Sequence, residues 1–410
     1  MKKIILILCC ILCCCACSNG NQAKEEKSSD FKSVAKKEVG NTEIPKGVEI
    51  VTDAAKFIAV KEDQEYQEQT DANNHVQEGA VNADIVGDTL YCIHDNRIFV
   101  KKQNENTATI LCSKPDCLHN EASCTAYIEG AHNAGLDYYD GALYYVDDFD
   151  QEDSIELRFM KSSSDGSVRD QVCILGTIMG LDKEHTCGSV SWILHRGYLY
   201  YIYELGNGVT EDTYYNNGSN CIWRRSLDDP EEAECIMPLT FGTNKGLVKF
   251  VADGSYLYFT QPEVRVQGRE SMLYRYNTES DQVEELMNLG MLSDYAIVNH
   301  EIYYKTLEEP EKVYRGDGTS KEPEILFSAD QSIGILYNDI LADEKGIVLT
   351  YDIPEESGVR TIRCEYDFSG NKIGEIERPE DMICYGFDDR YFYYDMDPTQ
   401  KEQLYCVNRP

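Results

Sequence analysis

The chain is organised by a recurring pattern in which a two-residue turn precedes a short run of apolar and aromatic residues. Seven copies cover most of the length, and they are centred on Leu90, Leu143, Leu199, Leu257, Ile302, Val348 and Phe392. Successive copies lie about 44 to 58 residues apart. This period is in the range of β-propeller blades and exceeds that of the shorter helical solenoid repeats.

Each copy carries the local signals of a β-hairpin. Turn pairs such as Asp140-Gly141, Arg196-Gly197 and Asn299-His300 separate two β-rich runs, and tight hairpins need a positive φ at one or both central positions. A third β-rich run follows in each copy and a fourth in most, and no amphipathic helical stretch of twelve or more residues interrupts them. The pattern predicts an all-β, seven-bladed β-propeller of four-stranded antiparallel blades.

The seventh copy has residues for only three strands before Pro410. We therefore expect the ring to be closed by an N-terminal strand, with AAKFIAVKE at residues 54–62 as the candidate. Closure would remove the exposed sheet edges that otherwise promote aggregation. An array of β-sandwiches is the alternative arrangement.

The N-terminus reads as an export signal followed by a polar spacer. Lys2 and Lys3 precede thirteen apolar residues, Ile4 to Ala16, which are too few to span a bilayer. The following residues are charged and nearly free of aromatics, so they cannot bury enough apolar surface to fold. We predict a signal peptide at residues 1–16, a disordered stalk at 17–46 and a propeller domain at 47–410.

The run Cys14-Cys15-Ala16-Cys17 resembles the lipobox of bacterial lipoproteins, with Cys14 in place of the usual Leu. The resemblance implies cleavage before Cys17 and a diacylglyceryl group on its sulfur, and two acyl chains suffice for stable anchoring. A plain secretory signal without lipid is the alternative. With the lipid, the mature protein lies at the extracytoplasmic face of the bacterial cell membrane.

The tyrosine-rich copies with Asp-Gly turns resemble the propellers of uncharacterised surface lipoproteins of Gram-positive anaerobic bacteria. These are in turn similar to the YWTD propellers of lipoprotein receptors. No copy contains the YWTD tetrapeptide, so the receptors' ligands do not carry over. The resemblance implies a propeller and does not imply catalysis.

One short segment between the first two copies concentrates soft metal ligands. LCSKPDCLHNEASC contains Cys112, Cys117, His119 and Cys124, and three thiolates with one imidazole are a ligand set that tetrahedral zinc takes. A disulfide between two of these cysteines is the alternative. The eleven cysteines after Cys17 are an odd number, which does not favour a complete disulfide framework. A structural zinc ion is thus the one cofactor that the sequence suggests.

Other cysteines and acids have plainer interpretations. Cys221 and Cys235 could pair, and the segment 147–153 could offer oxygen ligands to calcium, although it lacks the spacing of calcium loops. Several cysteines lie in apolar β patterns, where a free thiol behaves as a small buried hydrophobe: Cys92, Cys173, Cys364, Cys384 and Cys406.

Charge excludes one class of partner. The 73 acidic and 38 basic residues give a net charge of −35, which repels nucleic acid and anionic lipid head groups. Membrane contact is expected through the lipid anchor alone.

The sequence lacks the motifs of hydrolases, nucleotide-binding proteins and zinc peptidases, so no catalytic or cofactor-binding residue is predicted. We favour a non-enzymatic module that binds a cell-surface protein, peptide or glycan. The alternative is a propeller enzyme that acts on extracellular carbohydrate through Asp or Glu. Two facing carboxylates about 5 to 9 Å apart would favour the enzyme.

Overall fold

The computed structural model describes residues 49–51, 71, 76–77, 82–103, 105, 107–130, 135–151, 154–179, 187–205, 219, 221–239, 248–265, 268–318, 323–355, 358–378, 383–387, 390–394 and 404–408. The chain separates into two compact units, Met1–Glu43 and Ile44–Pro410. All described residues belong to the second unit. The predicted signal peptide, Cys17 and the stalk lie outside the described residues.

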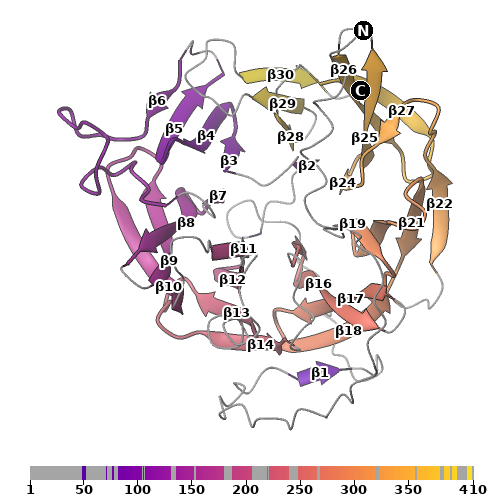
Figure 1. The fold of residues 1–410 in the computed structure, drawn as a ribbon, viewed down its shortest axis with the longest axis horizontal. Helices are drawn as coiled ribbons and strands as arrows, with labels where there is room; N and C mark the ends of the chain where they lie inside the picture. The colour runs from indigo at the N-terminus through magenta and orange to yellow at the C-terminus, as the bar shows by residue number, and fades with distance from the viewer. Residues whose placement is uncertain are drawn as a thin grey trace, which may run out of the picture. The chain divides into compact units, whose positions relative to one another are not determined.

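The second unit is an all-β propeller whose sheets surround a common centre (Figure 1). Blade 1 comprises β3 (Ala83–Val86), β4 (Thr89–His94), β5 (Arg97–Lys102) and β6 (Thr109–Ile110). Blade 2 comprises β7 (Leu136–Tyr139), β8 (Ala142–Asp150), β9 (Ser154–Ser163) and β10 (Arg169–Met179). Blade 3 comprises β11 (Cys187–His195), β12 (Tyr198–Leu205), β13 (Cys221–Ser226) and β14 (Glu234–Pro238). Within each blade, consecutive strands pair in antiparallel fashion.

The next three blades follow the same order. Blade 4 comprises β15 (Phe250–Asp253), β16 (Tyr256–Arg265), β17 (Gly268–Asn277) and β18 (Gln282–Asn288), and β1 (Glu49–Val51) adds to β18 in parallel. Blade 5 comprises β19 (Leu292–Val298), β20 (Glu301–Thr306), β21 (Lys312–Gly316) and β22 (Glu324–Ser328). Blade 6 has an inner strand in two pieces, β23 (Ile335–Leu336) and β24 (Leu341–Asp343), followed by β25 (Gly346–Glu355), β26 (Gly358–Tyr366) and β27 (Lys372–Glu377).

The prediction of seven blades is wrong, because six blades are built from consecutive strands in this way. The last repeat gives only three strands, β28 (Ile383–Phe387), β29 (Arg390–Tyr394) and β30 (Leu404–Asn408). The two-residue β2 (Val76–Gln77) joins them at the β28 edge, so no described strand occupies the outer position beside β30. Counting hairpin motifs overestimates blades, since a motif specifies two strands whereas a blade needs four.

The candidate closing strand at residues 54–62 lies outside the described residues, so its pairing stays a prediction. Among the described strands, β2 is the one that joins the C-terminal sheet from the N-terminal side. It pairs antiparallel to β28, with Val76 opposite Gly386. The first strands of neighbouring blades contact one another around the centre, as β3 does with β7 and β15 does with β19. Figure 1 shows β3 and β7 near the centre of the ring.

The core of the propeller lies between blades. Tyr144 and Tyr145 are adjacent on β8 and point to opposite faces, as the period of two in a strand requires. Both are buried, because Tyr144 packs into the interface with blade 3 and Tyr145 into the interface with blade 1. Both faces of blade 2 are covered by a neighbouring blade at these positions. Consecutive residues of the strand are therefore both buried, which explains why both are aromatic.

The predicted burial of strand cysteines is confirmed at the three positions whose burial the structure describes. Cys92, Cys173 and Cys364 are all buried, and burial raises the pKa of the Cys92 thiol to about 12. Cys221 and Cys235 form a disulfide between β13 and β14. Within the described part of the chain, no helix is long and apolar enough to cross a membrane.

Candidate metal centre

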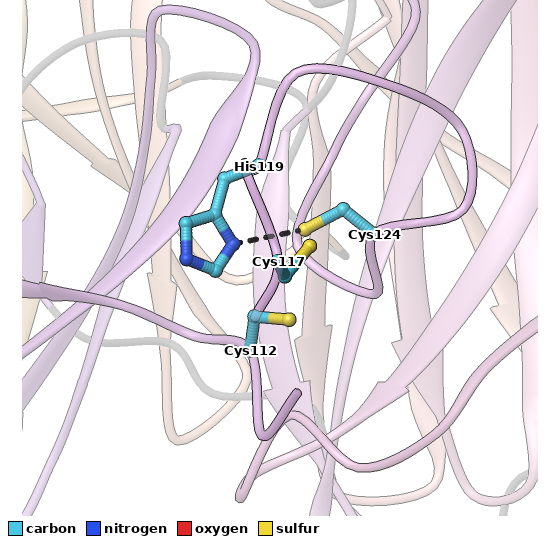
Figure 2. A group of neighbouring side chains, drawn as sticks. All are labelled: Cys112, Cys117, His119 and Cys124. Carbon is cyan, nitrogen blue, oxygen red and sulfur yellow. Dashed lines mark hydrogen bonds between the residues drawn. The ribbon is translucent and has the colours of Figure 1, made fainter. Parts of the chain in front are cut away.

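The four predicted ligands converge in the connection between blades 1 and 2. The ligand atoms of Cys112, Cys117, His119 and Cys124 all lie within 4.8 Å of one another, and Figure 2 shows the imidazole and the three sulfurs facing a common point. The Nδ1 atom of His119 is 3.3 Å from the Sγ atom of Cys124. The sequence therefore predicted a group of residues that the fold does bring together, and this group could hold a metal.

The spacing of these atoms suits a small tetrahedral ion. Zinc with bond lengths of about 2.3 Å to sulfur and about 2.0 Å to nitrogen places its ligand atoms roughly 3.5 to 3.8 Å apart. The ligand atoms therefore need to move by no more than about an ångström to enclose zinc. Cys124 is buried and the other three ligands are half-buried, so the group is partly shielded from solvent.

Backbone amides support two of the sulfurs. The amide of Ala126 donates a hydrogen bond to Cys124 Sγ at 3.4 Å, and the amide of Lys114 donates to the Cys112 sulfur. In both cases the donor lies two residues after the cysteine. Such outer contacts orient metal ligands and stabilise the thiolate form, so the loop conformation already favours thiolates at these two positions.

Two of the cysteines have displaced pKa values in opposite directions. Burial raises the pKa of Cys112, but hydrogen bonds from Thr125 and Lys114 outweigh burial and lower it to about 6. Burial and the neighbouring Cys117 and Cys112 raise the pKa of Cys124 to about 11. Three thiolates this close repel one another, and a divalent cation at the centre removes that repulsion.

The position of His119 depends on backbone geometry. Its φ is +56°, in the left-handed region that few non-glycine residues adopt. The Nε atom of Arg97 donates to the carbonyl oxygen of His119 at 2.6 Å, which fixes this peptide against the β4–β5 turn of blade 1. The side chain of the preceding residue, Leu118, is 82% exposed. Consecutive side chains of this loop therefore point to solvent and to the ligand group.

The loop is attached to both blades that it connects. On blade 1, the amide of Ile98 donates to Ala126 O at 2.9 Å and the amide of Ile128 donates to Asn96 O at 2.9 Å. On blade 2, the Thr125 hydroxyl donates to the carbonyl of Gly166 at 2.6 Å. A metal at this point would therefore fix the junction of blades 1 and 2.

Gly166 offers a specific test of this attachment. Its φ is +68°, and a Cβ atom there would lie 2.5 Å from Leu111 O and 2.9 Å from the amide nitrogen of Cys112. We expect Gly166→Ala to displace Cys112, to weaken zinc binding at least about tenfold, and to lower the free energy of unfolding by about 1–3 kcal/mol. Zinc competition with a chromophoric chelator and thermal unfolding measure the two effects.

The matched control is Gly141→Ala in the β7–β8 turn. Gly141 has a φ of +78° but no atom within 4 Å of the added Cβ. We expect a similar loss of stability from backbone strain and an unchanged zinc affinity. Equal zinc affinity in the two variants would contradict the role given to Gly166.

The structure contains no disulfide among the three cysteines of this cluster. Cys112, Cys117 and Cys124 are free thiols, whereas the disulfide that is present joins Cys221 to Cys235. The cluster therefore keeps the full set of three sulfurs that metal binding needs.

The acidic run at 147–153 does not form a calcium site among the described residues. Asp147 accepts hydrogen bonds from the amides of Glu129 and Gly130 through one oxygen and from Arg169 through the other. Both carboxylate oxygens thus have structural partners, at 2.6 to 3.1 Å.

A carboxyl pair that the sequence did not indicate lies on the inner strands. Asp84 on β3 and Asp137 on β7 hydrogen-bond to each other, and burial and the charge of Asp84 raise the pKa of Asp137 well above its usual range. Asp84 also accepts the amide of Tyr138 at 2.6 Å. Direct contact is closer than the separation of about 5 Å that retaining glycosidases need, so this pair shares a proton and links two blades.

Histidines and tryptophans outside the cluster have structural surroundings. His195 is buried, its Nε2 atom is 2.9 Å from Gly254 O, and burial lowers its pKa to about 4. His300 contacts Asp253 at 2.8 Å. Trp192 and Trp223 pack against the core between blades 2 and 3, so neither is an exposed platform for a sugar.

Comparisons with known proteins assign no family and no activity to the chain. No protein-family model matches the chain, and no curated protein matches it. Similar solved structures include an oligogalacturonate lyase in complex with manganese (10% identity, 79% of this chain and 74% of that chain, TM-score 0.40). The β-propeller domain of the Trilobed protease from Pyrococcus furiosus is another (10% identity, covering 82% of this chain and 93% of that chain, TM-score 0.44).

A structure from a study of two prolyl endopeptidases is also similar (12% identity, covering 83% of this chain and 50% of that chain, TM-score 0.48). The chain therefore spans about half the length of that protein. These three structures come from enzymes. At such identities and TM-scores they carry no argument about activity, and the fold class rests on the sheet topology above. A relationship to surface lipoproteins or to YWTD propellers stays a prediction.

Proposed function

We propose that this chain is a lipid-anchored, extracytoplasmic β-propeller that binds a partner without catalysing a reaction, and that a structural zinc ion fixes the junction of its first two blades. The main support for the zinc ion is the set of three cysteines and one histidine whose ligand atoms surround one point. Catalytic zinc keeps an open position for water, whereas four protein ligands close the coordination shell. Zinc held by this set would stabilise the fold and leave no site for metal-assisted hydrolysis.

Two observations support the extracytoplasmic location. The N-terminal run ending at Cys17 resembles a lipoprotein signal, and Cys221 and Cys235 form a disulfide. Disulfides persist in oxidising compartments and are rare in the cytosol. In such a compartment, a bound metal would also protect the three clustered thiols from oxidation.

Charge supports the choice of partner. A net charge of −35 disfavours nucleic acid and favours neutral or cationic surfaces. We propose a cell-surface protein, peptide or glycan as the partner, with the membrane reached only through the lipid on Cys17.

Thermal unfolding of the detergent-purified chain against cell-wall fragments, glycans and peptides tests the binding function. A ligand at a hundredfold excess over its Kd adds about 2.7 kcal/mol to stability. We expect one class to raise the unfolding midpoint without being consumed, as followed by chromatography. Conversion of that ligand to product would instead favour the carbohydrate-active enzyme.

The anchor has its own test in the bacterial host. We expect the wild-type chain to incorporate labelled palmitate and to partition into the detergent phase of Triton X-114, because two acyl chains bind membranes stably. Cys17→Ala should remove the label and move the protein to the aqueous phase. A wild-type chain without label would favour the plain secretory signal.

A further inference from the structure

The metal-binding loop interrupts the outer edge of blade 1. The outer strand β6 ends at Ile110, and the chain rejoins β5 at Ala126, whose carbonyl accepts the amide of Ile98 at 2.9 Å. Residues 112–125, which lie between these two attachments, contain no strand. Sheet pairing therefore fixes the two ends of the loop, whereas its interior depends on turns, side-chain contacts and the ligand group.

The first turn of the interior brings Cys112 and Cys117 together. The amide of Cys117 donates to Lys114 O at 3.4 Å, which closes a four-residue turn with Pro115 at its second position. Pro is favoured at this position, because its fixed φ suits the turn. The chain therefore reverses between the first two cysteines of the cluster.

A second turn does the same for the other two ligands. The amide of Cys124 donates to Glu121 O at 2.9 Å, so this turn lies between His119 and Cys124. Each half of the loop thus carries one pair of ligands. A metal held by all four ligands would join the two halves.

The pair in the first half is also the more accessible pair of sulfurs. Cys112 and Cys117 are half-buried, whereas Cys124 is 1% exposed. The sulfurs of Cys112 and Cys117 lie within 4.8 Å of each other. A disulfide has an S–S distance of about 2.0 Å, so these sulfurs need to approach by less than about 3 Å, which side-chain rotation can supply.

We propose that Cys112 and Cys117 form a reversible disulfide that expels the zinc ion, so that the loop is a redox switch. The inference rests on the structural zinc of the proposed function and names its regulation. The oxidant is a peroxide, since thiolates react with peroxides to give a sulfenic acid that a second thiolate converts to a disulfide. The two thiolates together give up two electrons, the S–S bond forms, the O–O bond of hydrogen peroxide breaks, and two protons from solvent complete two water molecules.

The expected consequence is a loosened junction between blades 1 and 2. After oxidation, His119 and Cys124 are the remaining members of the ligand set, and tetrahedral zinc takes four ligands. The two halves of the loop then lose their common ion. The hydrogen bond from Thr125 to Gly166 at 2.6 Å remains as an attachment to blade 2.

Titration of the reduced, zinc-loaded, detergent-purified chain with hydrogen peroxide tests the proposal. A chromophoric chelator measures released zinc. Non-reducing mass spectrometry maps the disulfide, because cleavage before Asp116 separates Cys112 from Cys117 and cleavage after Glu121 separates Cys117 from Cys124. We expect bound zinc to fall from about one ion per chain to below about a tenth as the Cys112–Cys117 disulfide forms. Excess dithiothreitol with zinc should restore the ion.

Two variants sharpen the test. Cys364→Ser removes a buried thiol outside the cluster and should release zinc and form the disulfide as the wild type does. Cys124→Ser removes the buried ligand but keeps the first pair, so peroxide should produce the same Cys112–Cys117 disulfide in it without bound zinc. Its absence from this variant would contradict the pairing.

The outcomes separate the switch from the structural zinc. A reduced chain that takes up no zinc refutes both. Zinc that stays bound through the titration leaves the structural zinc intact and refutes the switch alone. Zinc release with a disulfide from Cys124, or with sulfinic acids and no disulfide, also overturns the switch.

Discussion

Replacing Cys124 by Ser is expected to reduce bound zinc from about one ion per chain to below a tenth of that. Cys124 is the buried member of the ligand group, 1% exposed, and the group found among the described residues contains only two other sulfurs, those of Cys112 and Cys117. Changes to outer contacts of a zinc site already cost about 10–100-fold in affinity, so loss of a ligand should cost more than about 100-fold. Atomic emission and chelator competition measure the content and the affinity.

The control is Cys364→Ser, the same change at a thiol that is 0% exposed and lies on β26 in the core between blades 5 and 6. We expect it to lower stability by burying a hydroxyl while leaving zinc content unchanged. Full zinc content in Cys124→Ser would contradict the ligand assignment. A mass 2 Da lower for the unreduced peptide spanning 112–124 of the wild type would favour the disulfide alternative.

Replacing Phe159 by Ala is expected to destabilise the propeller by about 3–5 kcal/mol, the usual cost for a fully buried phenylalanine. Phe159 on β9 is 0% exposed. Its ring stacks on Tyr144 at 5.6 Å and meets Trp192 of blade 3 edge-on at 5.1 Å. The loss therefore opens a cavity between two blades, and equilibrium urea unfolding measures it.

Phe149→Ala provides the comparison within the same blade. Phe149 is half-buried on β8 and carries the guanidinium of Arg158 3.5 Å above its ring. A cation–π contact near solvent is worth about 0.5–1 kcal/mol, so we expect a loss of that order. Equal losses in the two variants would show that the interface between blades 2 and 3 is not a principal source of stability.

The strands and the metal-binding loop were predictable because their signals are local. A turn pair such as Asp140-Gly141 specifies a hairpin through the backbone angles that it allows, here +45° and +78°. The four ligands at the candidate metal centre fall within thirteen residues, so a short loop brings them together whatever the rest of the fold does. The pairing of Cys221 with Cys235 was foreseen as an option for the same reason.

Contacts between distant segments were not predictable. The Nε atom of Arg196 donates to Oδ1 of Asp71 at 2.9 Å, and nothing near Asp71 in the sequence points to this contact. Asp84 and Asp137 approach each other only because β3 and β7 are neighbouring inner strands. The blade count failed for a related reason. The motif around Phe392 predicts a hairpin correctly, yet the pairing of β2 with β28 decides how that sheet is completed.

The sequence by itself determined the all-β class, the repeated hairpins and the residues of the candidate metal centre, since turn geometry, strand period and short loops act over a few residues. The tertiary structure alone decided that six blades are built from consecutive strands, that tyrosines are buried on both faces of a blade, and that Arg196 meets Asp71. These features depend on how sheets pack around a centre. Packing is set by the sum of many weak contacts between segments far apart in the chain, so no single stretch of sequence encodes it.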